Sequence, residues 1–211
     1  SGLLLFKPNI YKDERGYFFE SWNEELFKSN GVDLRFVQDN QSFSHKNVIR
    51  GLHFQNPPYA QGKLVRVIQG SVIDVAVDLR KKSSTYGQYY SVELSSKNNY
   101  IFWIPPGFAH GFATLEDKTI FSYKCTNVYN KKSEGSLIWN DVDLNIDWGI
   151  DDPIVSSKDM NSIKFNDLNL NTYGRLEYGR DVSSSSSANR LASGKTKQRC
   201  RKLFSADSTR C

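Results

Sequence analysis

Histidine is scarce in this sequence, and one of the three histidines stands in an unexpected place. His53 lies in RGLHFQ, a stretch that otherwise has the pattern of a β-strand. Side chains alternate along a strand, so His53 and Gln55 share one face while Leu52 and Phe54 share the other. A lone interior histidine is more often a satisfied core residue than a catalyst. It is still a candidate general base, because the ordinary pKa of imidazole lies near neutrality.

A lysine and two tyrosines extend this candidate site. Lys63 begins the strand-like stretch KLVRVIQ, and Tyr123 and Tyr129 share a face of the alternating stretch TIFSYKCTNVY. If these faces line one barrel interior with His53, the groups suit abstraction of a proton next to a carbonyl. The imidazole would take the proton, the ammonium would stabilise the enolate oxygen, and a phenol opposite would return a proton. Arg50 offers positive charge for a phosphate.

Each of these residues also has a structural explanation. The tyrosines could be ordinary barrel aromatics with buried hydroxyl partners, and Lys63 could face solvent at the start of its strand. Lys63 is the hardest to dismiss, since buried lysines are rare unless they are paired or functional. His110, in GFAHGF, could cap backbone carbonyls in a turn. Spacing alone therefore leaves the catalytic interpretation suggestive.

A metal site is the competing use of the same imidazoles. Metal-binding β-barrels commonly use an H-x-H pair, an acid and a distant histidine. The residue two positions after His53 is Gln55, and His45 lies in the polar stretch SFSHKN. Only His110 then remains as a distant imidazole, which makes a weak ligand set. We therefore predict that the protein uses no metal and no cofactor.

The elements that must position these residues are mostly short strands. Apolar residues alternate with a period of two, with β-branched enrichment, between closely spaced turn signals. The predicted elements are two strands over 63–80 hinged at Gly70, strands before and after Pro105–Gly107, a strand over 119–129, a helix over 23–30 and a short helix after residue 150. This pattern predicts an all-β sandwich or barrel with a few short helices.

The net charge of +5 belongs to the C-terminal tail. Residues 175–211 hold nine Lys or Arg and three Asp or Glu, so they carry +6, whereas residues 1–174 are near neutral. The tail contains SSSSS and few aromatic residues, a composition that buries too little surface to offset the entropy of ordering. We predict one domain over 1–174, a low-complexity basic tail that is disordered or vector-encoded, and no nucleic-acid partner.

The compartment is also predicted from the sequence. No apolar run approaches the roughly 20 residues of a membrane span, and no signal-peptide pattern opens the chain. Residues 1–174 hold a single cysteine, Cys125, which provides neither a disulfide framework nor a zinc cluster. We therefore expect a cytoplasmic protein without a membrane partner.

Seven motifs occur in an order that is typical of one family. They are DERGYFFESW, FVQDNQSFS, NVIRGLHFQ, AQGKLVRVIQGSVIDVAVDLR, WIPPGFAHGF, YKCTNVY and SEGSLIWND. Together they closely resemble the RmlC family of dTDP-4-dehydrorhamnose 3,5-epimerases, over about residues 3–160. The resemblance implies a cupin-type jelly-roll β-barrel, a homodimer and a metal-free epimerase. Members convert dTDP-4-dehydro-6-deoxy-D-glucose, a dTDP-linked 4-keto-6-deoxy sugar, to dTDP-4-dehydro-L-rhamnose.

The resemblance implies a role for individual residues. His53 would be the catalytic base, and Asp159 of SSKD would pair with it. Tyr123 would be the general acid, and Lys63 would face the enolate. Substrate contacts are implied for Arg15, Glu20, Gln38, Asp39, Asn40, Arg50, His110, Tyr129, Glu134 and Lys158. Among these, one residue would hold phosphate (Arg50), one would lie near the sugar (His110), one would stack on thymine (Tyr129), and some would come from the partner subunit.

Three alternatives stay open at this point. A relative that inverts only C3 or only C5 would share the fold and the same three proton-transfer groups. A non-catalytic sugar-nucleotide-binding cupin should lack the base, the acid or both, and this chain keeps both. A metal-dependent cupin oxygenase is disfavoured by Gln55.

Overall fold

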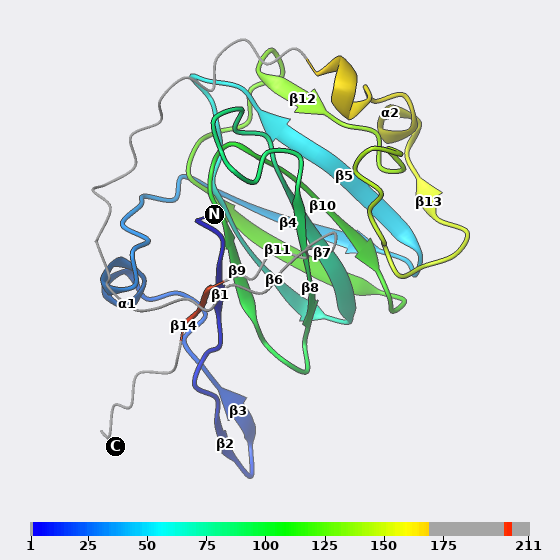
Figure 1. The fold of residues 1–211 in the computed structure, drawn as a ribbon. Coiled ribbons are helices and arrows are strands. Elements are labelled where there is room, and N and C mark those ends of the chain that lie inside the picture. The colour runs from blue at the N-terminus through cyan, green and yellow to red at the C-terminus, as the bar shows by residue number, and fades with distance from the viewer. Residues whose placement is uncertain (1, 169–200, 204–211) are drawn as a thin grey trace, which may run out of the picture.

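Two mainly antiparallel sheets face each other and enclose a common interior (Figure 1). The computed structural model describes residues 2–168 and 201–203. The first sheet has the order β14-β1-β9-β6-β11-β4, with β14 Arg201–Leu203, β1 Leu4–Phe6, β9 Ile101–Ile104, β6 Lys63–Gln69, β11 Thr119–Cys125 and β4 Gln38–Ser44. The second has the order β12-β5-β10-β7-β8, with β12 Glu134–Ser136, β5 Val48–Gln55, β10 Phe108–Thr114, β7 Ser71–Asp78 and β8 Tyr89–Ser95. The predicted two-sheet, all-β architecture is confirmed.

The remaining elements are short, and all but one, a two-residue strand that pairs with β5, lie outside the two sheets. They are the hairpin β2 Tyr11–Asp13 and β3 Gly16–Phe18, α1 Glu24–Ser29, β13 Ile154–Val155 beside β5, α2 Ser157–Met160, and a 3-10 helix over Phe165–Asp167. The predicted first helix begins after Asn23, whose side-chain oxygen accepts a hydrogen bond from the Leu26 N–H at 3.1 Å. That bond satisfies one of the free donors at the start of the helix.

The predicted strand over 119–129 is two elements rather than one. Strand β11 ends at Cys125, and the chain then crosses the end of the barrel as a loop that carries Tyr129. The backbone of residues 128–130 binds the side chains of Gln38 and Gln55 instead of a neighbouring strand. The prediction that Tyr129 shares a strand face with Tyr123 was therefore wrong, although both line the same end of the interior.

Alternation along the strands buries both faces of the second sheet. In β7, Val72 and Ala76 belong to the cluster between the sheets, whereas Val75 and Val77 belong to a cluster on the outer face. The inner cluster joins the two sheets through Val65, Val67, Phe102, Phe108, Phe112 and Phe121, among others. The outer cluster packs against the segment that follows β12, including Leu137, Leu144 and Trp148. The inner faces of the two sheets therefore contribute residues both to the core between the sheets and to the candidate site.

Strand β5 departs from simple alternation at Gly51. In the pairing of β5 with β10, His53 faces His110 and Arg50 faces Phe112, so β5 holds one extra residue there. Gly51 has a φ of +132°, and a Cβ at this position would lie 2.5 Å from the Gly111 Cα. Only glycine fits both the conformation and the close approach. The bulge turns Arg50 and His53 toward the same cavity.

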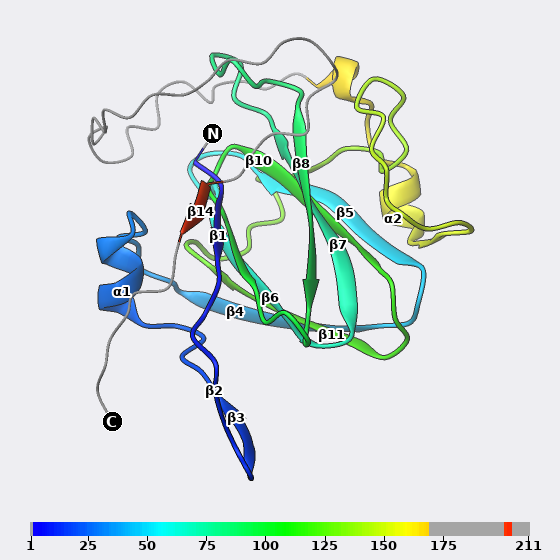
Figure 2. The ribbon, with the colours of Figure 1, turned by 60° about the horizontal axis from the view of Figure 1, so that its bottom comes forward.

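The hairpin β2–β3 projects from the barrel in both views (Figures 1 and 2). The predicted tail lies outside the described residues, apart from 201–203. Those three residues form β14, parallel to β1, where coil was predicted. In the part of the chain that the structure describes, no helix has the length and apolar character needed to cross a membrane.

Candidate active site

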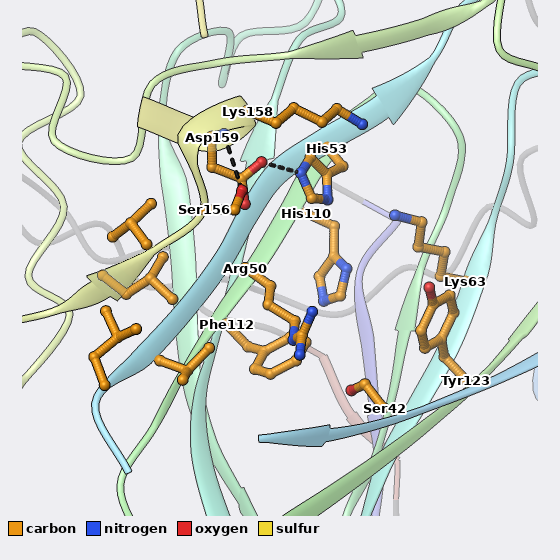
Figure 3. Close-up of a pocket in the computed structure, with 14 residues that line it drawn as sticks. Ser42, Arg50, His53, Lys63, His110, Phe112, Tyr123, Ser156, Lys158 and Asp159 are labelled. Carbon is orange, nitrogen blue, oxygen red and sulfur yellow. Dashed lines mark hydrogen bonds and ion pairs between the residues drawn. The ribbon is translucent and has the colours of Figure 1, made fainter. Parts of the chain in front are cut away.

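A cavity of about 540 Å³ opens between the two sheets (Figure 3). Its size is within the range of small-molecule sites. The second sheet supplies Arg50, His53, His110 and Phe112, the first supplies Ser42, Lys63 and Tyr123, and the segment around α2 supplies Ser156, Lys158 and Asp159. The sheets therefore place the predicted base and the predicted acid, His53 and Tyr123, on facing walls.

His53 and Asp159 form a hydrogen-bonded pair at one side of this cavity (Figure 3). The Nε2 atom of His53 lies 2.7 Å from the Asp159 carboxylate, whose side chain is only 5% exposed. Burial would raise the pKa of Asp159, but hydrogen bonds from His53, the Gly51 N–H and Ser156 hold it below its ordinary value. The carboxylate is thus ionised at neutral pH and orients the ring. Nδ1 is left as the ring nitrogen that can exchange a proton with a ligand.

Lys63 and Tyr123 stand together on the first sheet. Burial lowers the pKa of Lys63, because its ammonium loses solvating water, while Cys125, Asp74 and Glu134 partly oppose that shift. Burial likewise raises the pKa of the Tyr123 phenol. The Lys63 Nζ lies 5.9 Å from the centre of the Tyr123 ring. Lys63 is half-buried and lines the cavity rather than facing solvent alone, and a tyrosine that keeps its proton at neutral pH adjoins it.

His110 is a second buried imidazole, paired with an acid that the sequence analysis missed. Its Nε2 atom lies 2.9 Å from Asp74, and the two side chains are 6% and 0% exposed. Burial lowers the pKa of His110, although the carboxylate of Asp74 opposes the shift. A usable signal was present, since Asp74 lies between Val72 and Ala76 on the same interior face of its strand. His110 is therefore held in one orientation beside His53, its ladder partner.

A second cavity of about 370 Å³ shares His53, Lys63 and Tyr123 with the first. The other predicted residues that line it are Gln38, Asn40, Tyr129 and Glu134, and the sequence analysis did not foresee Phe54, Gln55 and Gln61 as lining residues. At its rim the Tyr129 hydroxyl donates to Glu134 (3.1 Å), and Glu134 also pairs with Lys158. The two cavities share His53, Lys63 and Tyr123 and therefore form one site. We call the first cavity the deep end of the site and the second, which has charged residues at its rim, the open end.

Three predicted site residues are not brought to either cavity. Arg15 is 84% exposed on the β2–β3 hairpin, where it pairs with Asp13, and Glu20 follows that hairpin. Asp39 points outward from β4, because Gln38 and Asn40 take the inner face, and it pairs with Lys124 at 2.9 Å. A single chain thus assembles the proton-transfer groups and most of the binding groups but leaves the hairpin residues apart.

Metal-ligating side chains do not gather in the described part of the chain. Within residues 2–168 and 201–203, no three His, Cys, Asp or Glu side chains lie together as ligands would. Gln55, at the position where an H-x-H pair would have its second histidine, uses its amide to bind backbone groups. His53 is already paired with Asp159. These two residues therefore do not form a metal-binding pair.

We accordingly expect activity to survive exhaustive chelation. His53 Nδ1 and the cavity-lining Lys63 can serve proton transfer and charge stabilisation without a metal ion. Turnover should be measured after dialysis against EDTA, with the metal content of the same sample determined in parallel. A loss of turnover that one added divalent ion restores would contradict this expectation.

A jelly-roll barrel with an open, polar cavity between its sheets defines the chain as a cupin-type protein. The family model of dTDP-4-dehydrorhamnose 3,5-epimerases matches residues 1–167. The chain therefore belongs to this family of isomerases, as the seven motifs had indicated.

Individual relatives agree with this placement. The dTDP-4-dehydrorhamnose 3,5-epimerase of Methanothermobacter thermautotrophicus is 52% identical over 76% of this chain and 88% of its own length. The structure of RmlC from Legionella pneumophila in complex with dTDP-4-keto-L-rhamnose is 47% identical with a TM-score of 0.75, covering 77% of this chain and 87% of that one. ChmJ, a 3'-monoepimerase from Streptomyces bikiniensis, is 31% identical with a TM-score of 0.74, covering 77% and 83%.

Proposed function

We propose that this chain inverts C3 and C5 of dTDP-4-dehydro-6-deoxy-D-glucose and so makes dTDP-4-dehydro-L-rhamnose. One observation carries the proposal. The Asp159-paired His53 and the phenol of Tyr123 belong to facing sheets, and Lys63 lines the same cavity. Inversion by deprotonation and reprotonation needs a proton acceptor on one face of the sugar and a donor on the other. This arrangement supplies both.

The first step removes the proton on a carbon next to the C4 ketone. His53 Nδ1 takes the proton from C3 or C5, and the electrons of the broken C–H bond delocalise onto the C4 oxygen. Asp159 accepts the hydrogen bond of the other ring nitrogen, which fixes the tautomer and stabilises the imidazolium that forms. The deep end of the site thus receives the sugar with its reacting face toward β5.

The enolate that results needs positive charge near its oxygen. Lys63 lines the cavity and supplies an ammonium donor, and its partly desolvated surroundings strengthen its attraction to the developing charge. C3 and C5 both flank C4, so one oxyanion position serves both inversions. Tyr123 then donates its proton to the carbon from the opposite face and completes the inversion.

The proposed reaction is tested by proton NMR of dTDP-4-dehydro-6-deoxy-D-glucose with the full chain in D₂O. We expect solvent deuterium at both C3 and C5, and reduction of the product should give the L-rhamno configuration. Label at one carbon only, with one inverted centre, would favour the single-centre alternative. The greater identity to the 3,5-epimerases than to the 3'-monoepimerase supports two inversions. Absence of both label and inversion would favour a protein that only binds nucleotide sugars.

Tyr129 is proposed as the platform on which the thymine base stacks. The residue is 53% exposed at the open end of the site, and its hydroxyl donates a hydrogen bond to Glu134. Stacking of a base on an aromatic ring contributes about 1–3 kcal/mol, so Tyr129→Ala should weaken dTDP binding about 5- to 150-fold. Calorimetric titration with dTDP measures the loss, with Tyr129→Phe as the matched control that keeps the ring. Unchanged dTDP affinity in Tyr129→Ala is the result that contradicts this role.

We further propose a homodimer in which each hairpin serves the neighbouring subunit. Tyr11, Tyr17 and Phe18 are each more than half exposed on β2–β3, a two-stranded ribbon that has little stability alone. A second copy of the chain would cover these rings and receive Arg15 at its own cavity. The proposal explains why the family motif DERGYFFESW contributes nothing to the cavity of its own chain.

Subunit mixing tests this arrangement. Arg15→Ala and His53→Ala should each be nearly inactive, yet co-expression should restore about a quarter of the wild-type turnover, because half of the dimers are hybrids with one intact site. Such restoration requires Arg15 to act in the partner subunit. Each variant expressed alone, at the same total concentration, is the control. Failure of the mixture to exceed its parents, in hybrids verified by mass, contradicts the arrangement, as does an active monomer in light scattering.

The cytoplasmic location and the single domain over 1–174 also stay proposals. A nucleotide-sugar substrate and the match of the family model to residues 1–167 support them. Fractionation of cells expressing the native gene tests the location. Turnover of a chain that ends at residue 174 tests the domain, and it should equal that of the full chain.

A further inference from the structure

The loop that carries Tyr129 is fastened by two glutamine side chains, one from each sheet. Residues 126–133 connect β11 to β12 across the open end of the site. Gln38, at the start of β4, accepts a hydrogen bond from the Tyr129 N–H at 2.8 Å. Gln55, at the end of β5, binds the residues on either side of Tyr129. We propose that Gln55 is a positioning residue for nucleotide recognition, which holds the Tyr129 ring where the base is to stack.

The contacts of Gln55 are specific to a primary amide. Its NH₂ group donates to the carbonyls of Val128 (3.1 Å) and Tyr59 (2.6 Å), and its oxygen accepts from the Asn130 N–H (2.7 Å). Turning the amide over would set donor against donor and acceptor against acceptor. One side chain thus reproduces for residues 128 and 130 the donor and acceptor that a neighbouring strand would offer.

Burial increases the energetic cost of losing these hydrogen bonds. Gln55 is only 5% exposed, so an amide that lost its partners here would carry the full desolvation cost of its polar atoms. The neighbouring bonds tie the same loop to residues 56–62. Thr126 exchanges hydrogen bonds with Gly62, and Gln61 donates to the Asn127 carbonyl at 2.8 Å. The loop is therefore fixed at its base by several bonds. Two side chains bind the segment that carries Tyr129: Gln38 binds Tyr129 itself, and Gln55 binds the residues on both sides of it.

Gln55 also sets the distance between the two ends of the site. It lies two residues after His53 on the same strand, so the proposed base and the anchor of the proposed platform share one rigid element. The nucleotide would then be seated in register with the sugar. This role of Gln55 rests on the proposed role of Tyr129. It assigns a function to the glutamine that stands where an H-x-H pair would have its second histidine.

The test compares dTDP affinity with turnover in Gln55→Leu, in the full chain. We expect dTDP to bind about tenfold more weakly and KM to rise in step. The value of kcat at saturating substrate should change less than about threefold, because neither His53 nor Tyr123 loses a partner. Gln69→Leu is the matched control. Gln69 also bonds a loop carbonyl, that of Lys118 at 3.2 Å, but it lines neither cavity.

A double-mutant cycle with Tyr129→Ala separates positioning from general damage. If Gln55 acts through the ring, Gln55→Leu should cost little further dTDP affinity once the ring is gone. Additive losses overturn the proposal, as does a fall in kcat with unchanged dTDP affinity. If Gln55→Leu does not fold, Gln55→Glu decides, since it keeps the acceptor for Asn130 and loses both donors. Weaker dTDP binding in Tyr129→Ala but not in the Gln55 variants defeats this inference alone, whereas unaltered binding in Tyr129→Ala defeats the platform itself.

Discussion

His53→Ala should abolish both epimerisation and the wash-in of solvent deuterium at C3 and C5. Without the imidazole no group on the β5 wall can take the proton, so the enolate does not form. His110, its neighbour, is a weaker base, because burial lowers its pKa although Asp74 opposes the shift. Positioned proton transfer contributes about 10²- to 10⁴-fold, and a loss of at least that size is expected in both readouts.

The measurement is time-resolved NMR of the substrate in D₂O, which follows exchange and inversion in the same sample. His45→Ala is the matched control, since His45 is an exposed histidine that pairs with Asp117 and lines neither cavity. Calorimetry with dTDP should give wild-type affinity for the His53 variant, which shows that the nucleotide end is intact. A His53→Ala protein that still exchanges either proton at a wild-type rate contradicts the assignment of the base.

The convergence of these groups could be anticipated from the sequence because most of them sit in regular strands. Each side chain on a strand lies on one of two faces. Alternation therefore predicts that Tyr123 and Cys125 share a face, and that Lys63 lies on the inner face if its strand lines the barrel. Strict alternation would place Arg50 on the face opposite to His53. The bulge at Gly51 reverses that relation, and it depends on the close contact with Gly111, a residue sixty positions away.

Other parts of the site depend on tertiary contacts that periodicity cannot supply. Asp159 belongs to a four-residue helix after a long irregular segment, and only the resemblance connected it with His53. Tyr129 continues an alternating pattern in the sequence, yet its segment is hydrogen-bonded by side-chain amides from two strands and not by the backbone of a neighbouring strand. Arg15 lines neither of the two cavities of its own chain. Such residues are predictable from family motifs or from the folded structure.

Tyr123→Phe should separate proton removal from proton return. The variant keeps the ring, its packing and the His53–Asp159 pair, so the enolate can still form. Burial raises the pKa of Tyr123, so the wild-type phenol is protonated at neutral pH and poised to donate. Once the hydroxyl is absent, no donor stands on the β11 wall at that carbon, and His53 returns a deuteron to the face from which it took the proton.

In D₂O this variant should therefore label C3 or C5 while the carbon keeps its starting configuration. Inversion should fall by about 10²- to 10⁴-fold while exchange falls far less, a split that a merely unfolded or weakened protein would not show. Tyr100→Phe, which removes a hydroxyl from a tyrosine outside both cavities, controls for the loss of the oxygen atom itself. The assignment fails if Tyr123→Phe inverts both centres at nearly the wild-type rate. It also fails if exchange and inversion fall together, because proton removal would then depend on the phenol as much as proton return does.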